Sequence, residues 1–146
     1  MNEPTPLRLL FLCTGNSCRS QMAEGLARAL GGEMVAVYSA GIEAHGKNPR
    51  AIEVMNEMGV DISAQESTVV TDAMLQGADL VVTVCGHADE SCPVLPAGVR
   101  KLHWPLPDPA RAEGSEEEVM AQFRQVRDDI ARRVHTLIHE ELSAQK

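Results

Sequence analysis

The chain has 146 residues and a formal net charge of −8, so residues 1–146 are long enough to form a single domain with a substantial core and too acidic to suit a nucleic-acid partner. No apolar run approaches the roughly 20 residues of a membrane span, and residues 1–6 lack the layout of a signal peptide. We therefore expect a cytoplasmic protein that does not contact membranes, in which the 4 cysteines are more often catalytic or metal-binding than bridged.

Strands and helices are expected to alternate along the chain. Continuous apolar runs predict strands at residues 7–12, 34–39 and 80–84, with a short fourth strand around Leu102. Helical periodicity predicts helices that include residues 22–30, 49–58, 71–76 and 115–142. The prolines between Pro93 and Pro109 favour an irregular loop there. Such alternation predicts an α/β fold, a doubly wound four-stranded parallel sheet with helices on both faces.

Two of the expected helices carry start signals. Asn48-Pro49 combines a capping residue with proline at the first helical position, and the helix that follows is expected to turn Ile52, Met55 and Met58 inward before Gly59 stops it. Residues 115–118, Ser-Glu-Glu-Glu, form a capping box for the last helix. The apolar stripe of that helix keeps the 3.6-residue period over about seven turns.

The first strand leads directly into Cys-Thr-Gly-Asn-Ser-Cys-Arg-Ser at residues 13–20, and a helix follows. A helix N-terminus leaves backbone N–H groups unpaired and carries about half a positive charge, so a loop wrapped around it suits a tetrahedral oxyanion. Gly15 and Asn16 tolerate the left-handed backbone that lets successive N–H groups converge. The loop residues expected to bind an anion are Thr14, Gly15, Asn16, Ser17, Cys18, Arg19 and Ser20.

Cys13 and Arg19 give this loop its chemistry. Arg19 supplies a planar fork that can hold two oxygens at once. The field of the helix favours the thiolate form of Cys13 at neutral pH, and the Ser20 hydroxyl can add a bond to that sulfur. The spacing Cys-x5-Arg-Ser resembles the signature of phosphatases that pass through a cysteinyl-phosphate. A buried thiol beside a surface arginine is the alternative that involves no chemistry.

A second thiol, Cys85, follows the strand predicted at residues 80–84. If that strand neighbours the first one, about 4.8 Å away, the sulfurs of Cys13 and Cys85 can meet at the edge of the sheet where ligands bind. In a helix Cys92 would lie about 10 Å along the axis from Cys85, whereas bridged cysteines need Cα atoms within about 7 Å. We hypothesise that residues 85–92 form a moving redox segment that unwinds when bridged.

The chain resembles the thioredoxin-coupled arsenate reductases, a branch of the low-molecular-weight tyrosine phosphatase superfamily. The resemblance rests on residues 13–25, Tyr38-Ser-Ala-Gly-Ile, Asn48-Pro49, the Cys85/Cys92 pair, His103-Trp104 and Asp108-Pro109. It implies that Cys13, Cys85 and Cys92 are redox cysteines and that Asp108 is the general acid. It also implies arsenate as substrate and thioredoxin as electron donor, with no bound cofactor. Cys18 is then a packing thiol, and a monomer is the simplest expectation.

The resemblance leaves open whether a cation binds near the anion-binding loop. Some members of the family hold a potassium ion near the anion-binding loop, and Asn16, Glu24 and Ser39 resemble part of such a site. Thr68 stands where a further acidic ligand is expected. No metal is therefore assigned from the sequence.

Two other functions compete with arsenate reduction. A low-molecular-weight tyrosine phosphatase would use the same Cys13, Arg19 and Asp108, but it needs aromatic walls, and only 3% of this chain is aromatic. Ala110 follows Asp108-Pro109 where those phosphatases place a tyrosine, and a phosphatase has no use for the second pair of cysteines. A zinc or arsenite binder would use as ligands Cys85, His87, Cys92 and His103. Their residue types suit zinc, although their spacing matches no common zinc module.

Overall fold

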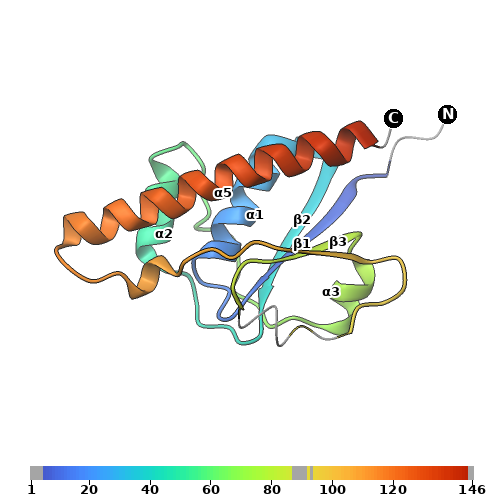
Figure 1. Cartoon of the computed structure of the whole chain (residues 1–146), viewed down its shortest axis with the longest axis horizontal. Coiled ribbons are helices and arrows are strands. Elements are labelled where there is room, and N and C mark those ends of the chain that lie inside the picture. The colour runs from blue at the N-terminus through green and yellow to red at the C-terminus, as the bar shows by residue number, and fades with distance from the viewer. Residues whose placement is uncertain (1–4, 87–91, 93, 145–146) are drawn as a thin grey trace.

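The computed structural model describes residues 5–86, 92 and 94–144. Strands and helices alternate along it (Figure 1). The elements are β1 (Leu7–Cys13), α1 (Arg19–Gly31), the 3-10 turn η1 (Gly32–Met34), β2 (Val35–Gly41), α2 (Pro49–Asn56), α3 (Asp72–Gly77), β3 (Leu80–Thr83), β4 (Arg100–His103), the 3-10 turn η2 (Pro109–Arg111) and α5 (Glu116–Ala144).

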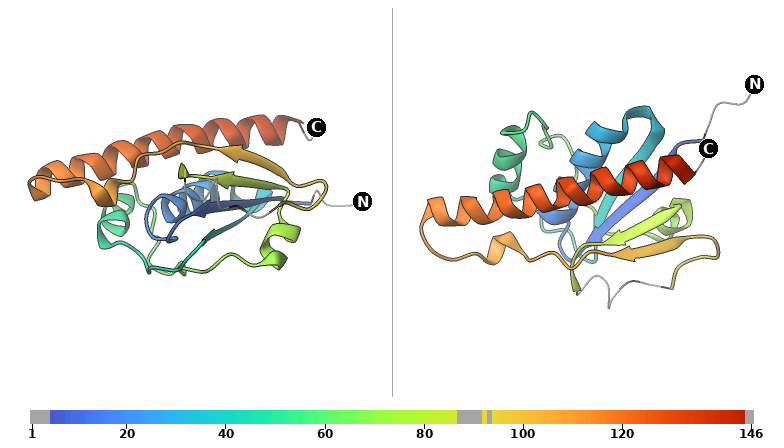
Figure 2. Two further views of the ribbon diagram at one scale, coloured as in Figure 1. Left: turned by 60° about the horizontal axis from the view of Figure 1, so that its bottom comes forward. Right: turned by 45° about the horizontal axis from the view of Figure 1, so that its top comes forward.

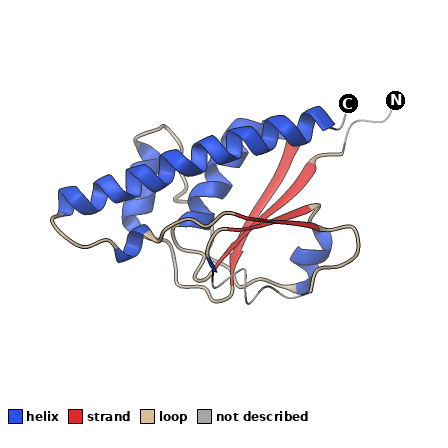
Figure 3. Cartoon of the chain, viewed as in Figure 1, coloured by secondary structure: helices blue, strands red, loops and turns tan. Residues whose placement is uncertain are grey.

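The described strands form one four-stranded parallel sheet in the order β2-β1-β3-β4 (Figure 3). In the register, Leu10 of β1 pairs with Tyr38 on one side and with Val81 on the other. The two central strands are buried almost throughout, which explains why their sequences are continuous apolar runs rather than alternating ones. The predicted parallel sheet is confirmed.

Helices cover both faces of this sheet, as predicted. Helices α1, α2 and α5 contact one another on one face, and α3 lies on the other side of the sheet from α5 (Figure 2). The core fills the space between the sheet and the α1/α5 layer. Its largest fully buried side chains include Leu9, Phe11, Met22, Phe123 and Ile130.

The predicted helix caps are present. The Asn48 side chain accepts a hydrogen bond from Arg50 N (2.9 Å), with Pro49 at the first position of α2. At the start of α5 the bonds are reciprocal: Ser115 Oγ accepts from Glu118 N (3.1 Å), and Glu118 Oε1 accepts from Ser115 N (3.3 Å). Local sequence therefore fixes where both helices begin.

One expectation about local structure is wrong. Met58 is 45% exposed, because α2 ends at Asn56 and Val54 takes the buried position beside Met55. The short strand predicted around Leu102, within the proline-rich stretch, is confirmed as the edge strand β4, which pairs with β3. Within the described residues, no helix has the length and apolar character needed to cross a membrane.

Candidate active site

The anion-binding loop joins the end of β1 to the start of α1, and its carbonyl groups are held by the segment that follows β2. The bonds join Ile42 N to Cys13 O (3.0 Å), Glu43 N to Thr14 O (2.8 Å), His45 N to Gly15 O (2.9 Å) and Asn48 N to Ser17 O (3.2 Å). In a trans peptide the N–H points opposite to the C=O. With its carbonyls turned toward residues 42–48, the loop directs N–H groups into its own interior, as an anion requires.

Two backbone positions let the loop close in this way. Asn16 has a φ of 49°, in the left-handed region that asparagine tolerates better than most residues. Gly41 at the end of β2 packs directly against the loop, and a Cβ there would lie 2.8 Å from Asn16 N and 2.2 Å from Glu43 O. Both contacts are with backbone, so only glycine fits at position 41 without moving the loop.

Cys13 is buried at the bottom of the loop and its sulfur lies 2.9 Å from Ser20 Oγ. Ser20 Oγ in turn accepts from Asn16 Nδ2 at 2.8 Å. Asn16 and Ser20 are both fully buried behind the loop. These two residues, predicted as substrate-binding, therefore support the loop from behind, whereas Cys13 lines the cleft in front of it.

Arg19 and Asp108 face each other across the cleft. Arg19 Nη1 donates to Leu106 O (3.0 Å), and its Nη2 lies 3.7 Å from Asp108 Oδ2. The same Asp108 oxygen is 3.8 Å from Arg111 Nε, while Oδ1 accepts from Ala110 N at 3.0 Å and so caps η2. The predicted anion-holding arginine and the predicted general acid are thus brought together from segments 89 positions apart.

Cys85 opens onto the same cleft. It lies just beyond β3, which neighbours β1, and its sulfur is 3.2 Å from Thr14 Oγ1 of the loop. Cys13 and Cys85 are therefore both cleft residues, as the expected strand order required. Cys92 is half-buried, and all four cysteines are thiols. Residues 87–91 and 93 lie outside the described part of the chain, so the hypothesis of a moving segment stays a prediction.

Cys18 is a buried thiol within the loop. Burial, followed by the negative charge of Asp108, raises the pKa of Cys18 to about 12. The side chain therefore stays protonated at neutral pH, which agrees with a packing role rather than a nucleophilic one.

The cleft has a volume of about 660 Å3. Its lining consists of Cys13, Thr14, Gly15, Ser17, Cys18, Arg19, His45, Cys85, Asp108, Ala110 and Arg111. Sequence reasoning missed His45 and Arg111. His45 follows β2 and packs on Gly15, and Arg111 ends η2, so their positions depend on tertiary contacts. Two features of the sequence could have indicated them: His45 lies in the loop that follows Tyr38-Ser-Ala-Gly-Ile, and Arg111 lies just after Asp108-Pro109.

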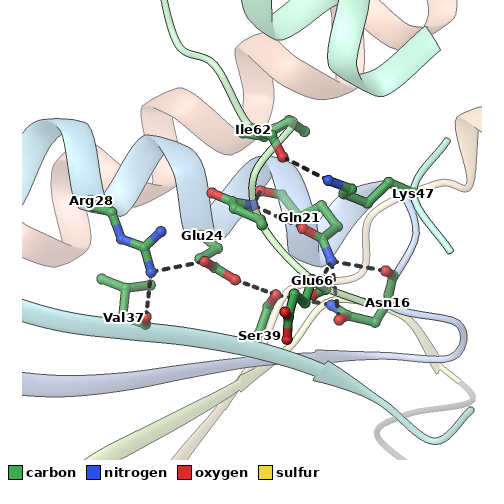
Figure 4. Close-up of polar contacts among 10 residues, drawn as sticks. Asn16, Gln21, Glu24, Arg28, Val37, Ser39, Lys47, Ile62 and Glu66 are labelled. Atoms are coloured by element: carbon green, nitrogen blue, oxygen red, sulfur yellow. Dashed lines mark hydrogen bonds and ion pairs between the residues drawn. The ribbon is translucent and has the colours of Figure 1, made fainter. Parts of the chain in front are cut away.

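Within the ranges described, no three His, Cys, Asp or Glu side chains gather as a metal site requires. Of the four ligands considered for zinc, His87 lies outside those ranges, and the His103 ring is 2.8 Å from Thr83 Oγ1 through Nδ1. The residues considered for potassium meet behind the loop, where Asn16 Nδ2 donates to Ser39 Oγ (2.9 Å) and Ser39 Oγ donates to Glu24 Oε1 (2.6 Å) (Figure 4).

The sequence profile described as "Low molecular weight phosphotyrosine protein phosphatase" matches residues 8–146. The chain belongs to this family. It is 56% identical over 128 residues to an arsenate reductase of Halalkalibacterium halodurans, a match that covers 88% of this chain and 92% of that protein.

Solved structures agree with this assignment to the low-molecular-weight phosphatase family. "An arsenate reductase in the phosphate binding state" is 35% identical, with a TM-score of 0.75 and coverage of 92% of this chain and 98% of that one. The thioredoxin-dependent arsenate reductase of Corynebacterium glutamicum is 29% identical, with a TM-score of 0.76, and the match covers 97% of this chain and 65% of that chain. The predicted fold class and family are confirmed.

Proposed function

We propose that this protein is a thioredoxin-dependent arsenate reductase. One observation carries the proposal: a buried thiol from outside the anion-binding loop, Cys85 after β3, lines the same cleft as Cys13. A phosphatase of this family needs the loop but has no step for a second thiol. The 56% identity to a protein named arsenate reductase supports the same choice.

The first step is nucleophilic attack on bound arsenate. Arsenate resembles phosphate in charge and shape, so the N–H groups of the loop and the fork of Arg19 hold its oxygens. The Cys13 thiolate forms a bond to arsenic while Asp108, in its protonated form, gives its proton to the departing hydroxyl, which leaves as water. Asp108 lies close enough to Arg19 to face an oxygen that this arginine holds.

The second step transfers electrons to arsenic. Cys85, as a thiolate, attacks the Cys13 sulfur, and the electron pair of the sulfur–arsenic bond moves to arsenic, which leaves as arsenite. A Cys13–Cys85 disulfide remains. Cys92 then attacks Cys85, releases Cys13 as a thiolate and leaves a Cys85–Cys92 disulfide for thioredoxin to reduce. Such a thiol relay needs a reducing compartment, which places the activity in the cytoplasm.

The proposal is tested by NADPH consumption in the presence of arsenate, thioredoxin and thioredoxin reductase. The wild type is expected to turn over continuously. Cys92→Ser is expected to release about one equivalent of arsenite and then stop as the Cys13–Cys85 disulfide, whereas Cys85→Ser releases essentially none. Continuous turnover by Cys92→Ser would refute the relay, and no arsenate-dependent oxidation by the wild type would refute the reductase.

Phosphatase activity is the second candidate, since the family is described by it. The described lining of the cleft contains His45 and Ala110 but no Phe, Tyr or Trp. A small aryl phosphate therefore enters the loop without an aromatic wall to hold its ring. We expect slow hydrolysis of para-nitrophenyl phosphate as a side activity, and a catalytic efficiency above that for arsenate would reverse the ranking.

A further inference from the structure

A second arginine, Arg111, lies at the rim of the active-site cleft. It lines the same cleft as the buried Cys13, yet its own side chain is 89% exposed. The cleft volume of about 660 Å3 is in the range of pockets that hold drug-sized ligands, so a tetrahedral oxyanion at the loop occupies only part of it. An anion that enters from solvent therefore passes the rim before it reaches the loop.

Arg111 and Arg19 differ in how firmly they are held. The Arg19 side chain is only 11% exposed, and its Nη1 donates to Leu106 O at 3.0 Å. In the described part of the chain, the ion-pair partner of Arg111 is Asp108, with 3.8 Å between Arg111 Nε and Asp108 Oδ2. That distance is too long for a hydrogen bond, and an exposed pair of this kind adds little stability. The Arg111 guanidinium can therefore turn from Asp108 toward an incoming anion at little cost.

The balance of charge around the cleft depends on Arg111. Among the described lining residues, with His45 taken as neutral, the charged side chains are Arg19, Arg111 and Asp108. Asp108 Oδ2 lies 3.7 Å from Arg19 and 3.8 Å from Arg111, so its charge offsets that of one arginine. The other arginine leaves the lining with a net positive charge, in a chain whose formal net charge is −8. Without Arg111 the lining is formally neutral within an acidic protein, which does not attract anions.

The Arg111 side chain is not needed to build the turn that carries it. The turn η2 is held by Asp108 Oδ1, which accepts from Ala110 N at 3.0 Å, and by Asp108 O, which accepts from Arg111 N at 3.2 Å. Both bonds use the backbone of residues 110 and 111. A substitution at position 111 therefore removes the charge and leaves these bonds in place.

We propose that Arg111 captures the incoming oxyanion: its guanidinium attracts a tetrahedral oxyanion to the rim and passes it to Arg19 and the loop N–H groups. Charged residues at the rim of a site act mainly on the rate of association. Arg111 then contributes to capture and not to the chemical step. This role rests on the proposed function, in which the captured anion is arsenate, but capture of an anion can be measured on Cys13 without arsenate turnover.

The experiment compares the alkylation of Cys13 by iodoacetate, an anion, with that by iodoacetamide, its neutral analogue. Both reagents react with the same sulfur, so the ratio of their rates cancels any change in the reactivity of Cys13 itself. Peptide mass spectrometry measures the two rates in low salt and in about 0.5 M sodium chloride, where the screening length is a few ångströms.

The proteins are wild type, Arg111→Gln, Arg111→Lys and a matched control, Arg132→Gln. Arg132 is also an exposed arginine with an aspartate three positions before it, at 3.6 Å from Asp129. It is not among the described residues that line the cleft. The control therefore makes the same change in net charge and breaks the same kind of surface pair at a distance from Cys13.

In Arg111→Gln the rate with iodoacetate relative to iodoacetamide is expected to fall about three-fold in low salt and less in high salt, because the lost interaction is between separated charges. Arg111→Lys and Arg132→Gln are expected to keep the wild-type ratio. An unchanged ratio in Arg111→Gln would overturn the proposal. An equal fall in Arg132→Gln would also overturn it, because the effect would then come from the net charge of the protein.

Arsenate kinetics give a second measurement. In Arg111→Gln, kcat/KM for arsenate is expected to fall about ten-fold with kcat nearly unchanged, because arsenate carries more negative charge than iodoacetate. A fall in kcat with an unchanged KM would instead mean that Arg111 positions Asp108, and it would overturn the proposal. If the wild type does not reduce arsenate, the proposed function fails, while the alkylation ratio still decides whether Arg111 captures anions.

Discussion

Asp108 has two roles that one substitution can separate: it caps η2, and it is the proposed proton donor. Its Oδ1 caps η2 through Ala110 N, while its Oδ2 faces the arginines at positions 19 and 111. Asparagine keeps an oxygen for the cap and is nearly the same size, but it cannot donate a carboxylic proton. The cap and the proton transfer can therefore be tested apart.

Asp108→Asn is expected to lower kcat for arsenate by roughly 100- to 10 000-fold, the usual contribution of a general acid. Its thermal midpoint is expected to match the wild type, because the cap is retained. Asp61→Asn is the matched control, since Asp61 Oδ1 likewise accepts from a backbone N–H, that of Ser63 (2.8 Å). Steady-state kinetics and thermal melts of the three proteins suffice. A near-wild-type kcat in Asp108→Asn would show that Asp108 is not the general acid.

The sequence predicted those site residues whose chemistry is concentrated in a motif, and it missed those placed by folding. Cys13 and Arg19 belong to one loop, and Cys85 follows a readable strand. His45 reaches the cleft only because its backbone bonds to Gly15 O, a contact between two loops. Arg111 is an 89% exposed side chain, which sequence alone cannot tell from any surface arginine.

At the scale of elements, helix α5 depends on its first turn. The reciprocal bonds between Ser115 and Glu118 satisfy donors that the start of a helix leaves open. Beside them, Glu116 receives two bonds from Arg50 of α2. The turn η2, which carries the Asp108 cap, packs against α5. The start of α5 therefore supports the wall of the cleft.

Ser115→Ala is expected to lower the free energy of unfolding by about 1 kcal/mol, the usual value of an N-cap. In a domain of this size that corresponds to a fall of about 2–4 °C in the thermal midpoint. Ser115→Thr, which keeps the hydroxyl, should lie within a few tenths of a kcal/mol of wild type. Chemical denaturation of the three proteins measures the difference. Equal losses in the alanine and threonine variants would show that the hydroxyl cap is not the cause.

The ends of helices and strands could be predicted from the sequence where a cap marks them. They could not be predicted where tertiary contacts decide them. The starts of α2 and α5 carry readable caps. The end of α2 does not, because Met58 continues the apolar spacing although the helix has already stopped. Strand β4 was predicted only as a short strand around Leu102, because all four of its residues are exposed at the sheet edge and no apolar face marks its ends.

At the scale of the whole molecule, the strand order makes the site. Because β1 lies between β2 and β3, the loop after β1 touches the segment after β2 on one side and Cys85 after β3 on the other. The alternation of strands and helices predicted a parallel sheet. That β1 and β3 are neighbours was only assumed, as the condition under which the sulfurs of Cys13 and Cys85 can meet. No residue pattern in the chain fixes that order by itself, since it results from packing of the helices on both faces.

The helical layer is tied together by ion pairs that depend on pH. Glu57, at the end of α2, pairs with Arg124 and Arg127 of α5. The hydrogen bond from Arg124, with further bonds and charge from Arg127, lowers the pKa of Glu57 from 4.5 to about 2. Arg8 lowers the pKa of Asp79 in the same way. A carboxyl whose pKa is lowered by folding adds stability above its unfolded value, and that stability is lost as the pH falls toward the folded value.

We therefore expect the urea midpoint of unfolding to change little from pH 7 to about pH 5 and to fall steadily from pH 4.5 toward pH 2. Fluorescence of Trp104, the single tryptophan, reports the transition from its buried position beside Phe11. Glu57→Gln should be less stable than wild type at pH 7, where it lacks the ion pairs, and should approach wild type at the acid end, where the carboxyl is protonated in both states. If the two curves instead stay parallel from pH 7 to pH 2, the link between α2 and α5 is not a charged one, and the acid sensitivity belongs to Asp79 and the other paired carboxyls.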